Sequence, residues 1–334
     1  MLGVGAYGSV YRALDIESGE LRAIKCLRIS GLDSRQRAFQ NQETELHTLV
    51  SGHPNIATLH KVVEEDECLY MVLDCGVEGD LFCKITERGG YVGNDLAIKS
   101  IFGQIASAVM HCHSKGVYHR DLKPENIIMF GECAKLVDFG LATTEPFSSE
   151  FGCGSTFYLS PECQGGYIEP VKSYDSAAND VWSLGVILVN LVFGRNPWKQ
   201  ACTRDETFAA YVLNNNFLQT ILPMSDELNK IIKAVFCLNP RKRISLLDLV
   251  LRVQSCRSFT TTDIYRSSAS TSASAPSAAT TAVDAATPHS DVTTTAQAPI
   301  ESFFVPRDKF CGAYEKDQTQ SQSQDSGIDI HSMA

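Results

Sequence analysis

The sequence lacks an excess of basic residues, a paired-cysteine motif and a long uninterrupted apolar run. Its 334 residues include 29 lysines and arginines against 39 aspartates and glutamates, which gives a formal net charge of -10. Nucleic-acid binding depends on cationic side chains that neutralise phosphates. The charge balance therefore argues against nucleic-acid binding and favours basic protein partners.

Other absences bear on location. Twelve cysteines are scattered along the chain without a Cys-x-x-Cys pair, which disfavours both a disulfide framework and a cysteine-bound metal. The opening Met1-Leu2-Gly3 has neither the basic nor the apolar region of a secretory signal. The apolar stretch from Val181 to Phe193 contains polar residues and is too short to span a bilayer, so a buried helix is predicted. We expect a reduced cytoplasmic or nuclear location and no membrane association.

The first 75 residues predict a small sheet with one helix. A helical pattern runs over 35–50, where Phe39, Leu46 and Val50 recur on one face. Strand-like runs occupy 9–13, 21–26, 62–63 and 69–73.

From Asn94 onward the pattern is mainly helical, and either Asn94 or Asp95 can cap the first long helix. The predicted class is α+β, with a small lobe over 1–75 and a larger helical lobe over 76–257. The region 258–334 is rich in Ser, Thr, Ala and Gln and is predicted to be a disordered tail. Within this tail, 300–304 and 310–314 are either docking segments or simply less polar stretches. Further helices are expected over 180–193, 207–214 and 226–237.

Glycines recur near the start in Gly3-Val4-Gly5-Ala6-Tyr7-Gly8. Such a loop lets backbone amides approach phosphates because no Cβ intervenes. The pattern alone is weak, since dinucleotide-binding folds share it, but there it leads into a helix and here it leads into a strand. The candidate nucleotide contacts are Gly3, Val4, Gly5 and Gly8.

Lys25 lies on a predicted strand, where alternation places it on the same face as Ala23. The small Ala23 leaves room for a base, and Lys25 can reach phosphates, although a solvated surface lysine is the plainer alternative. A buried lysine needs a carboxylate partner. Glu43 shares the packed helix face with Leu46, whereas Glu45 points nearly the opposite way, so Glu43 is the expected partner.

The run His119-Arg120-Asp121-Leu122-Lys123-Pro124-Glu125-Asn126 is followed by Asp138-Phe139-Gly140. In order and separation these motifs resemble those of the eukaryotic protein-kinase superfamily. The resemblance covers Leu2 to about Cys256. It implies a bilobal kinase fold, ATP and Mg²⁺ as cofactors, and transfer of the γ-phosphate to protein hydroxyls. Lys123 is similar to the serine/threonine rather than the tyrosine form of the loop.

The resemblance also implies roles for individual residues. Asp121 would orient the substrate hydroxyl and accept its proton, while Lys123 would support the transferred phosphate. Asn126 and Asp138 would hold Mg²⁺. Lys25, paired with Glu43, would bind the α and β phosphates. Val10, Ala23 and Ile128 would sandwich the adenine. Leu73 would occupy the gatekeeper position, and residues 74–76 would form the hinge, with Asp74 and Gly76 as implied nucleotide contacts.

The rest of the domain is similar to the same family. Ser160-Pro161-Glu162 stands where these kinases carry Ala-Pro-Glu, and Arg243 is the implied partner of Glu162. Asp180 is implied to brace residues 119–126, the catalytic loop of the resemblance. Together with Arg195-Asn196-Pro197-Trp198, the Ser-Pro-Glu motif resembles a fungal branch that includes regulators of nutrient response and meiotic entry.

Two features depart from the family. Only Met1 and Leu2 precede Gly3, so the first strand is expected to be short, and a longer form is expected to show a higher melting temperature or turnover. The position that relatives often phosphorylate is Phe151, which cannot accept phosphate. We therefore expect activity without phosphorylation of the activation segment, with Glu150 or Glu145 supplying negative charge to Arg120. The alternative phosphorylation sites are Ser148 and Ser149.

His47 occupies a position where relatives place an apolar residue, so a neutral core histidine is expected, with a pH switch as the alternative. Asp80 and Glu125 stand where basophilic relatives bind an arginine three residues before the acceptor. A plain exposed turn is the alternative for Asp80. Because Asn190 replaces an acid of some relatives, a second arginine is expected to matter less.

The main rival function is a pseudokinase, or a catalytically weak fragment, that binds nucleotide as an interaction module. It is disfavoured because the implied lysine, proton acceptor and two metal ligands are all present. A small-molecule kinase of related fold is disfavoured by Ser160-Pro161-Glu162. We expect a monomer that acts on protein substrates.

Overall fold

The computed structural model describes residues 1–5, 8–87, 90–167 and 169–261. These residues belong to one compact unit that spans Met1–Ala279. The predicted tail from residue 262 onward, with its two possible docking segments, lies outside the described residues.

An antiparallel sheet forms the N-terminal lobe, with the strand order β1-β2-β3-β5-β4. The register places Val10 opposite Lys25, and Ala23 opposite Leu73. Side chains of directly opposite residues share a face, so the candidate nucleotide residues line one side of the sheet. The strands are β1 (Gly3–Gly5), β2 (Gly8–Leu14), β3 (Leu21–Arg28), β4 (Leu59–Glu65) and β5 (Cys68–Asp74).

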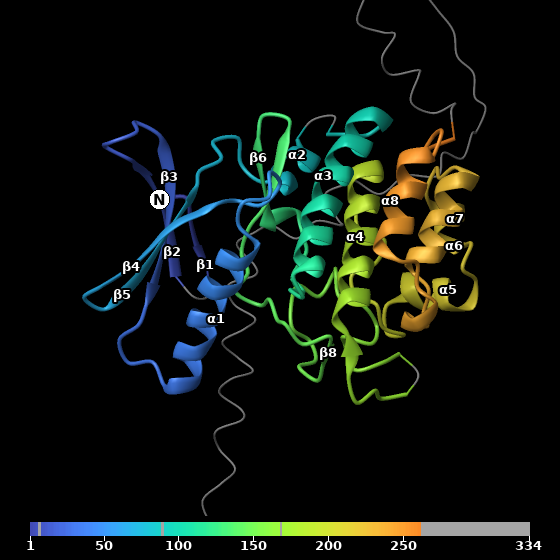
Figure 1. The fold of residues 1–334 in the computed structure, drawn as a ribbon. Coiled ribbons are helices and arrows are strands. Elements are labelled where there is room, and N and C mark those ends of the chain that lie inside the picture. The colour runs from blue at the N-terminus through green and yellow to red at the C-terminus, as the bar shows by residue number, and fades with distance from the viewer. Residues whose placement is uncertain (6–7, 88–89, 168, 262–334) are drawn as a thin grey trace, which may run out of the picture. The chain divides into compact units, whose positions relative to one another are not determined.

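Helix α1 (Ser34–Val50) belongs to the same lobe as this sheet (Figure 1). Asp33 and Gln36 form a reciprocal capping box, which satisfies two backbone donors at its start. Glu43, Leu46, His47 and Val50 are buried. Phe39 departs from the prediction, because it is 42% exposed, with the Arg35 guanidinium 5.7 Å from its ring centroid.

The C-terminal lobe is mainly helical, as predicted. The Asn94 side chain accepts a hydrogen bond from the Ala97 backbone and thereby caps α3, which decides between Asn94 and Asp95. Helix α4 begins before the predicted residue 180, because Asp175 caps it through the Ala178 amide. The helices are α2 (Leu81–Thr86), α3 (Asp95–Ser114), α4 (Ser176–Phe193), α5 (Glu206–Leu213), α6 (Phe217–Ile221), α7 (Asp226–Val235) and α8 (Leu246–Ser255).

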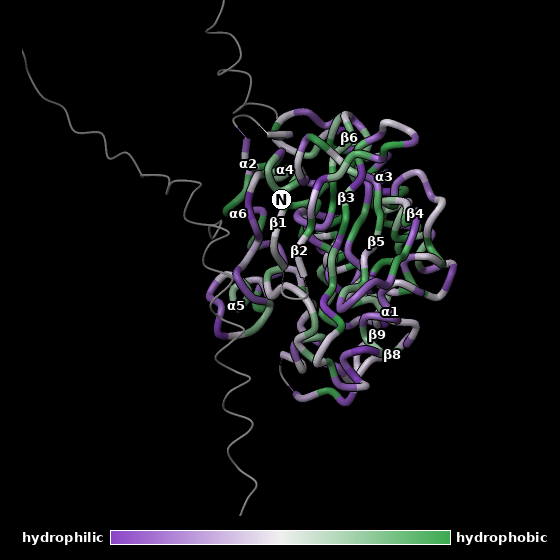
Figure 2. The backbone as a smooth tube through the Cα atoms, turned by 90° about the vertical axis from the view of Figure 1, so that its left-hand side faces the viewer, coloured by the Kyte–Doolittle hydropathy of each residue, from purple (hydrophilic) through white to green (hydrophobic). Residues whose placement is uncertain are grey.

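Helix α4 is the centre of this lobe. Among the described residues it is the one helix long and apolar enough to cross a membrane, yet 83% of it is buried inside the protein, as the sequence predicted. Trp182 packs on Trp198 and Phe236, with ring centroids 5.6 and 4.9 Å away. Figure 2 shows hydrophobic colour also along β3 and β5 of the other lobe. The α+β, two-lobed architecture expected from the sequence is therefore confirmed.

Two small hairpins position the chemistry. Strands β6 (Ile127–Phe130) and β7 (Cys133–Leu136) join the catalytic loop to Asp138. Strands β8 (Phe147–Ser148) and β9 (Tyr174–Asp175) pair with each other and tie the segment after Asp138 to the start of α4. Residues 138–162, which begin at Asp138 and include β8, form the activation segment.

Candidate active site

Lys25 stands between two carboxylates. Its Nζ lies 2.5 Å from Glu43 Oε1 and 2.9 Å from Asp138 Oδ1, whereas Glu45 is exposed. Desolvation disfavours the charged form of Lys25, but Asp138 and Glu43 outweigh it and raise the lysine pKa. Desolvation likewise raises the pKa of Asp138, and the ammonium of Lys25 more than offsets this and lowers it to about 2. Lys25 is therefore cationic and Asp138 anionic at neutral pH.

Asp180 binds the backbone of the catalytic loop. Its two carboxylate oxygens accept the backbone amides of His119 and Arg120, each at 2.9 Å. Arg120 and Asp138 both have a φ of +64°, a left-handed conformation that is rare for residues other than glycine. Fully buried Asp180 thus stabilises a loop whose backbone is locally strained.

Asp121, Lys123 and Asn126 converge in this loop. Lys123 Nζ donates to Asp121 Oδ2 at 2.6 Å, and the Asn126 amide donates to the Asp121 carbonyl at 2.9 Å. Ser155, from the activation segment, donates its backbone amide to Asp121 Oδ1 and accepts Lys123 through its hydroxyl. Desolvation lowers the pKa of Lys123, but Asp121 outweighs it and raises the pKa, so the lysine remains charged.

The residues present fit a magnesium ion. The Asn126 amide nitrogen is occupied by Asp121, which leaves the Asn126 Oδ1 atom as an oxygen ligand without a partner among the described residues. Asp138 adds an anionic carboxylate. Mg²⁺ prefers few protein oxygens and completes its shell with phosphates and water, so the lack of a larger His, Cys, Asp or Glu cluster in the described part of the chain is compatible with it.

The predicted adenine contacts come from both lobes. Val10, Ala23 and Leu73 share one face of the sheet, and Ile128 lies on β6 of the other lobe. A Cβ added to Gly76 would lie 2.2 Å from Ile128 Cγ2, so the hinge runs close against β6. No residue with a side chain can replace glycine there without a shift of the backbone or of Ile128.

The glycine loop is described only at its two ends. Gly3 and Gly5 pair with Val10 and Gly8 in the β1–β2 ladder, while residues 6 and 7 lie outside the described part. A Cβ on Gly8 would come within 2.1 Å of the Cys26 carbonyl oxygen. The close packing of Gly8 against β3 therefore requires glycine at this position, whether or not the loop binds phosphate.

Asp74 has a second role that the sequence did not indicate. Its carboxylate accepts Lys135 Nζ and His60 Nε2, each at 2.7 Å, and the Thr58 amide at 3.0 Å. Desolvation raises the pKa of Asp74, and Lys135 and Thr58 overcome this and lower it to about 2. Because Lys135 lies on β7, the hinge carboxylate links the sheet to the catalytic lobe. Nothing local in the sequence marks Lys135 or Ser155, which reach the site from distant parts of the chain.

His47 forms part of a column of rings. Its ring centroid lies 4.7 Å from that of Phe139, which in turn lies 5.1 Å from that of His119. His47 Nε2 is 2.7 Å from the Ala57 carbonyl oxygen, and burial lowers the pKa of His47 to about 4. This geometry is that of the neutral core histidine expected from the sequence.

The activation segment is bound to Arg120. Arg120 donates to Glu150 Oε2 at 2.8 Å and to Ser148 Oγ at 3.1 Å, whereas Glu145 makes no contact with it among the described residues. Of the two alternative phosphorylation sites, Ser148 is fully buried and Ser149 is exposed. Glu150 is thus the acid that faces Arg120.

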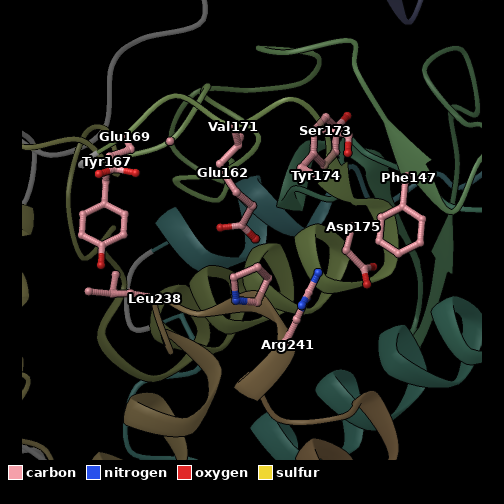
Figure 3. Close-up of a pocket in the computed structure, with 12 residues that line it drawn as sticks. Phe147, Glu162, Tyr167, Glu169, Val171, Ser173, Tyr174, Asp175, Leu238 and Arg241 are labelled. Carbon is pink, nitrogen blue, oxygen red and sulfur yellow. The ribbon is translucent and has the colours of Figure 1, made fainter.

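A cavity of about 560 Å³ lies beside the same segment (Figure 3). Its walls include exposed Phe147, together with Val171, Tyr174 and Arg241, arranged around an open centre. Glu162 also lines it but is paired with Arg243, at 2.5 and 3.1 Å. The cavity shares none of the side chains predicted to bind nucleotide or metal.

Comparison with known proteins identifies the family of this chain. A model of the protein kinase domain matches residues 1–253. The chain is 49% identical to a protein of Schizosaccharomyces pombe named negative regulator of sexual conjugation and meiosis, over 78% of this chain and 60% of that protein. It is 33% identical to the serine/threonine-protein kinase VHS1 of Saccharomyces cerevisiae, over 78% of this chain and 69% of that protein.

A third relative is the serine/threonine-protein kinase SKS1 of Saccharomyces cerevisiae, which is 37% identical over 66% of this chain and 46% of that protein. The alignments thus span about half to two thirds of these relatives. The domain match extends over most of the chain and includes every residue of the site described above. This chain therefore belongs to the protein kinase family and is similar to fungal serine/threonine kinases.

Proposed function

We propose that the chain is an active kinase that transfers the γ-phosphate of ATP to serine or threonine hydroxyls of proteins, with Mg²⁺. The observation that carries the proposal is Lys25, held between Glu43 and Asp138 at hydrogen-bond distances. This arrangement joins the nucleotide face of the sheet to the candidate metal ligand of the other lobe. A pseudokinase has no need to keep all of these contacts.

The chemistry divides among the residues of the loop. Lys25 would bind phosphate oxygens of ATP, and Mg²⁺ held by Asn126 and Asp138 would offset charge on the phosphates. The substrate hydroxyl gives its proton to Asp121 as its oxygen forms a bond to the γ-phosphorus, and the bond from that phosphorus to the bridging oxygen breaks to leave ADP. Ser155 and Asn126 fix the orientation of Asp121 by hydrogen bonds. Lys123, which donates to Asp121 at 2.6 Å, would offset charge on the transferred group.

A preference for an upstream arginine is part of the proposal. Glu125 Oε2 is buried without a hydrogen-bond partner among the described residues, and burial raises the pKa of this carboxyl, with Asp80 adding to the effect. A substrate guanidinium would satisfy it by a charge-assisted bond. Asp80 is 5% exposed and caps α2, which disfavours the plain exposed turn.

We expect a second upstream arginine of the substrate to bind more weakly than the first, because Asn190 offers it no carboxylate. The Asn190 side chain accepts from the Tyr158 hydroxyl at 3.1 Å and donates to the Arg195 carbonyl and to Asn196 Oδ1. Its amide is therefore engaged within the protein. The absence of a carboxylate at Asn190 supports one dominant arginine upstream of the acceptor.

The test is phosphate transfer from γ-labelled ATP to two matched serine peptides, with Arg or Ala three residues before the acceptor. The parent chain should modify the Arg peptide with at least about tenfold higher kcat/KM, which corresponds to one charge-assisted contact. Asp138→Asn should lose most transfer to both peptides because its carboxylate is removed. Glu125→Gln should lose mainly the preference for arginine.

The outcomes separate the parts of the proposal. Folded parent chain without transfer to either peptide would favour the pseudokinase. Equal rates on the two peptides, with Asp138→Asn inactive, would keep the kinase and remove the arginine preference. Circular dichroism of each variant controls for loss of the fold.

We further propose that Glu150 replaces an activating phosphate. Phosphatase treatment should leave activity within about twofold, because a carboxylate already pairs with Arg120. Glu150→Ala should lower kcat severalfold, whereas Glu145→Ala, an exposed acid of the same segment, should not. Loss of activity on dephosphorylation, mapped to Ser149 by mass spectrometry, would contradict this assignment.

A further inference from the structure

Three successive backbone carbonyls after Gly140 each accept a hydrogen bond from another part of the chain. Leu141 O accepts Arg120 Nε at 2.7 Å, and Thr143 O accepts the Tyr118 amide at 2.8 Å. Between them, Ala142 O accepts Gln42 Nε2 at 3.0 Å. The first part of the activation segment is therefore fixed from the catalytic loop on both sides and from helix α1 in the middle.

Gln42 is the neighbour of Glu43 on α1. The two side chains diverge, so that Glu43 reaches Lys25 on the sheet and Gln42 reaches the activation segment in the other lobe. Ala142 is 3% exposed, and its carbonyl has no other hydrogen-bond partner among the described residues. A shift of α1 away from the segment would leave this buried acceptor unpaired, which is unfavourable.

Arg120 joins two parts of the activation segment, its beginning at Leu141 and the later Glu150. The guanidinium of Arg120 donates to Glu150 with one nitrogen and to the Leu141 carbonyl with another. Leu141 and Ala142 are consecutive, so the contacts form a continuous series. Glu150 contacts Arg120, Arg120 contacts the beginning of the segment, and the beginning of the segment contacts Gln42, the neighbour of Glu43. At its end lies Lys25, the proposed phosphate ligand.

We propose that Gln42 is a positioning residue, which couples the location of helix α1, and so the Glu43–Lys25 pair, to the beginning of the activation segment, which Arg120 also binds. The assignment rests on the proposed kinase activity. In the described part of the chain, Gln42 has no hydrogen bond to a residue proposed to bind nucleotide or metal, so we expect its effect on transfer to pass through Glu43. Its hydrogen bond favours the α1 position in which Glu43 meets Lys25.

The chain offers a matched control on the same helix. Gln40 Nε2 donates to the Arg28 carbonyl at 2.9 Å, a side-chain-to-backbone bond of the same kind, but one that stays within the N-terminal lobe. Gln42→Ala should lower kcat/KM for ATP about threefold to tenfold, the range expected for loss of one such bond. Part of the loss should be a higher KM for ATP, because Lys25 binds phosphate. Gln40→Ala should leave both constants within about twofold.

Two further variants distinguish positioning from general destabilisation. Gln42→Lys keeps a donor of sufficient length and should recover most of the lost kcat/KM, whereas Gln42→Met, of similar size, should not. In a double-mutant cycle with Glu150→Ala, the combined loss should be clearly smaller than the product of the single losses, because both changes release the same segment.

Each possible outcome supports or contradicts the role proposed for Gln42. Equal effects of Gln42→Ala and Gln40→Ala, or independent losses that multiply in the cycle, would overturn the role of Gln42 while leaving an active parent chain and the proposed function intact. A folded parent chain that transfers no phosphate would overturn both. Unequal single effects, recovery by lysine and a non-multiplicative cycle together support the coupling.

Discussion

Replacing Arg243 with alanine should lower the free energy of unfolding by about 3–5 kcal/mol, because it leaves Glu162 as a buried carboxylate without its counter-ion. The Arg243 side chain is 1% exposed and that of Glu162 is 7% exposed, and two hydrogen bonds of 2.5 and 3.1 Å join them. Arg243 also donates to the carbonyls of Ala178 and Cys237. The unpaired charge and the lost hydrogen bonds act in the same direction.

The measurement is equilibrium unfolding in urea at neutral pH, compared with a control at an exposed ion pair. Arg257 pairs with Glu227 through its Nε at 2.6 Å, but its side chain is 89% exposed, so Arg257→Ala should cost less than about 1 kcal/mol. The double variant Arg243→Met with Glu162→Gln should recover part of the loss, because no buried charge remains. An Arg243→Ala loss no larger than that of Arg257→Ala would show that the buried pair adds little.

The position of this pair indicates which parts of the protein its loss would separate. Glu162 ends the activation segment, and Arg243 follows helix α7 and stacks over Trp182 of α4, 4.9 Å from its ring centroid. The pair therefore fixes the end of the segment to the core helix of the lobe. The beginning of the segment is fixed by Arg120, at the catalytic loop. Both ends of the segment are thus bound to the helical lobe, which suits the proposed action on protein substrates.

Short-range patterns predicted the parts of the site that depend on local geometry. The position of Glu43 on the inner face of its helix follows from 3.6-residue periodicity, and the pairing with Lys25 is present in the structure. The common face of Ala23 and Lys25 follows from strand alternation. The class of fold follows from the change from strand to helix patterns, together with motifs whose separation identifies the family.

What the sequence did not predict depends on contacts between distant segments. Ser155 joins Asp121 across 34 residues, and Gln42 joins Ala142 across 100 residues. No local pattern distinguishes these polar residues from ordinary surface ones. The start of α4 was predicted four residues too late, at 180 instead of Ser176, because its cap, Asp175, lies outside the apolar pattern from which the helix was predicted. Phe39 was expected in the core by periodicity, but its turn of α1 remains exposed.

Lowering the pH should destabilise the protein through His47. Burial, with a smaller contribution from nearby Lys25, lowers the pKa of this histidine to about 4, against 6.5 in the unfolded chain. Between these values the unfolded chain binds a proton that the folded protein excludes, so stability is lost as pH falls from about 6.5 to 4. The full difference corresponds to about 3 kcal/mol, of which about 2 kcal/mol should be lost by pH 5.

The control is His47→Leu, which keeps a similar volume against Phe139 and cannot titrate. The groups that face His47 (Lys25, Asp138 and His119) remain in both proteins, so the difference between their urea unfolding curves at pH 7.5 and pH 5 reports His47 alone. Asp74 and Asp138, whose pKa values are lowered to about 2, contribute mainly below pH 4 and equally to both. The variant should lose its hydrogen bond to Ala57 at neutral pH, yet its stability should fall less on acidification. Parallel losses in the two proteins would instead show that His47 takes up a proton in the folded state, and hence that the ring column accommodates a charge.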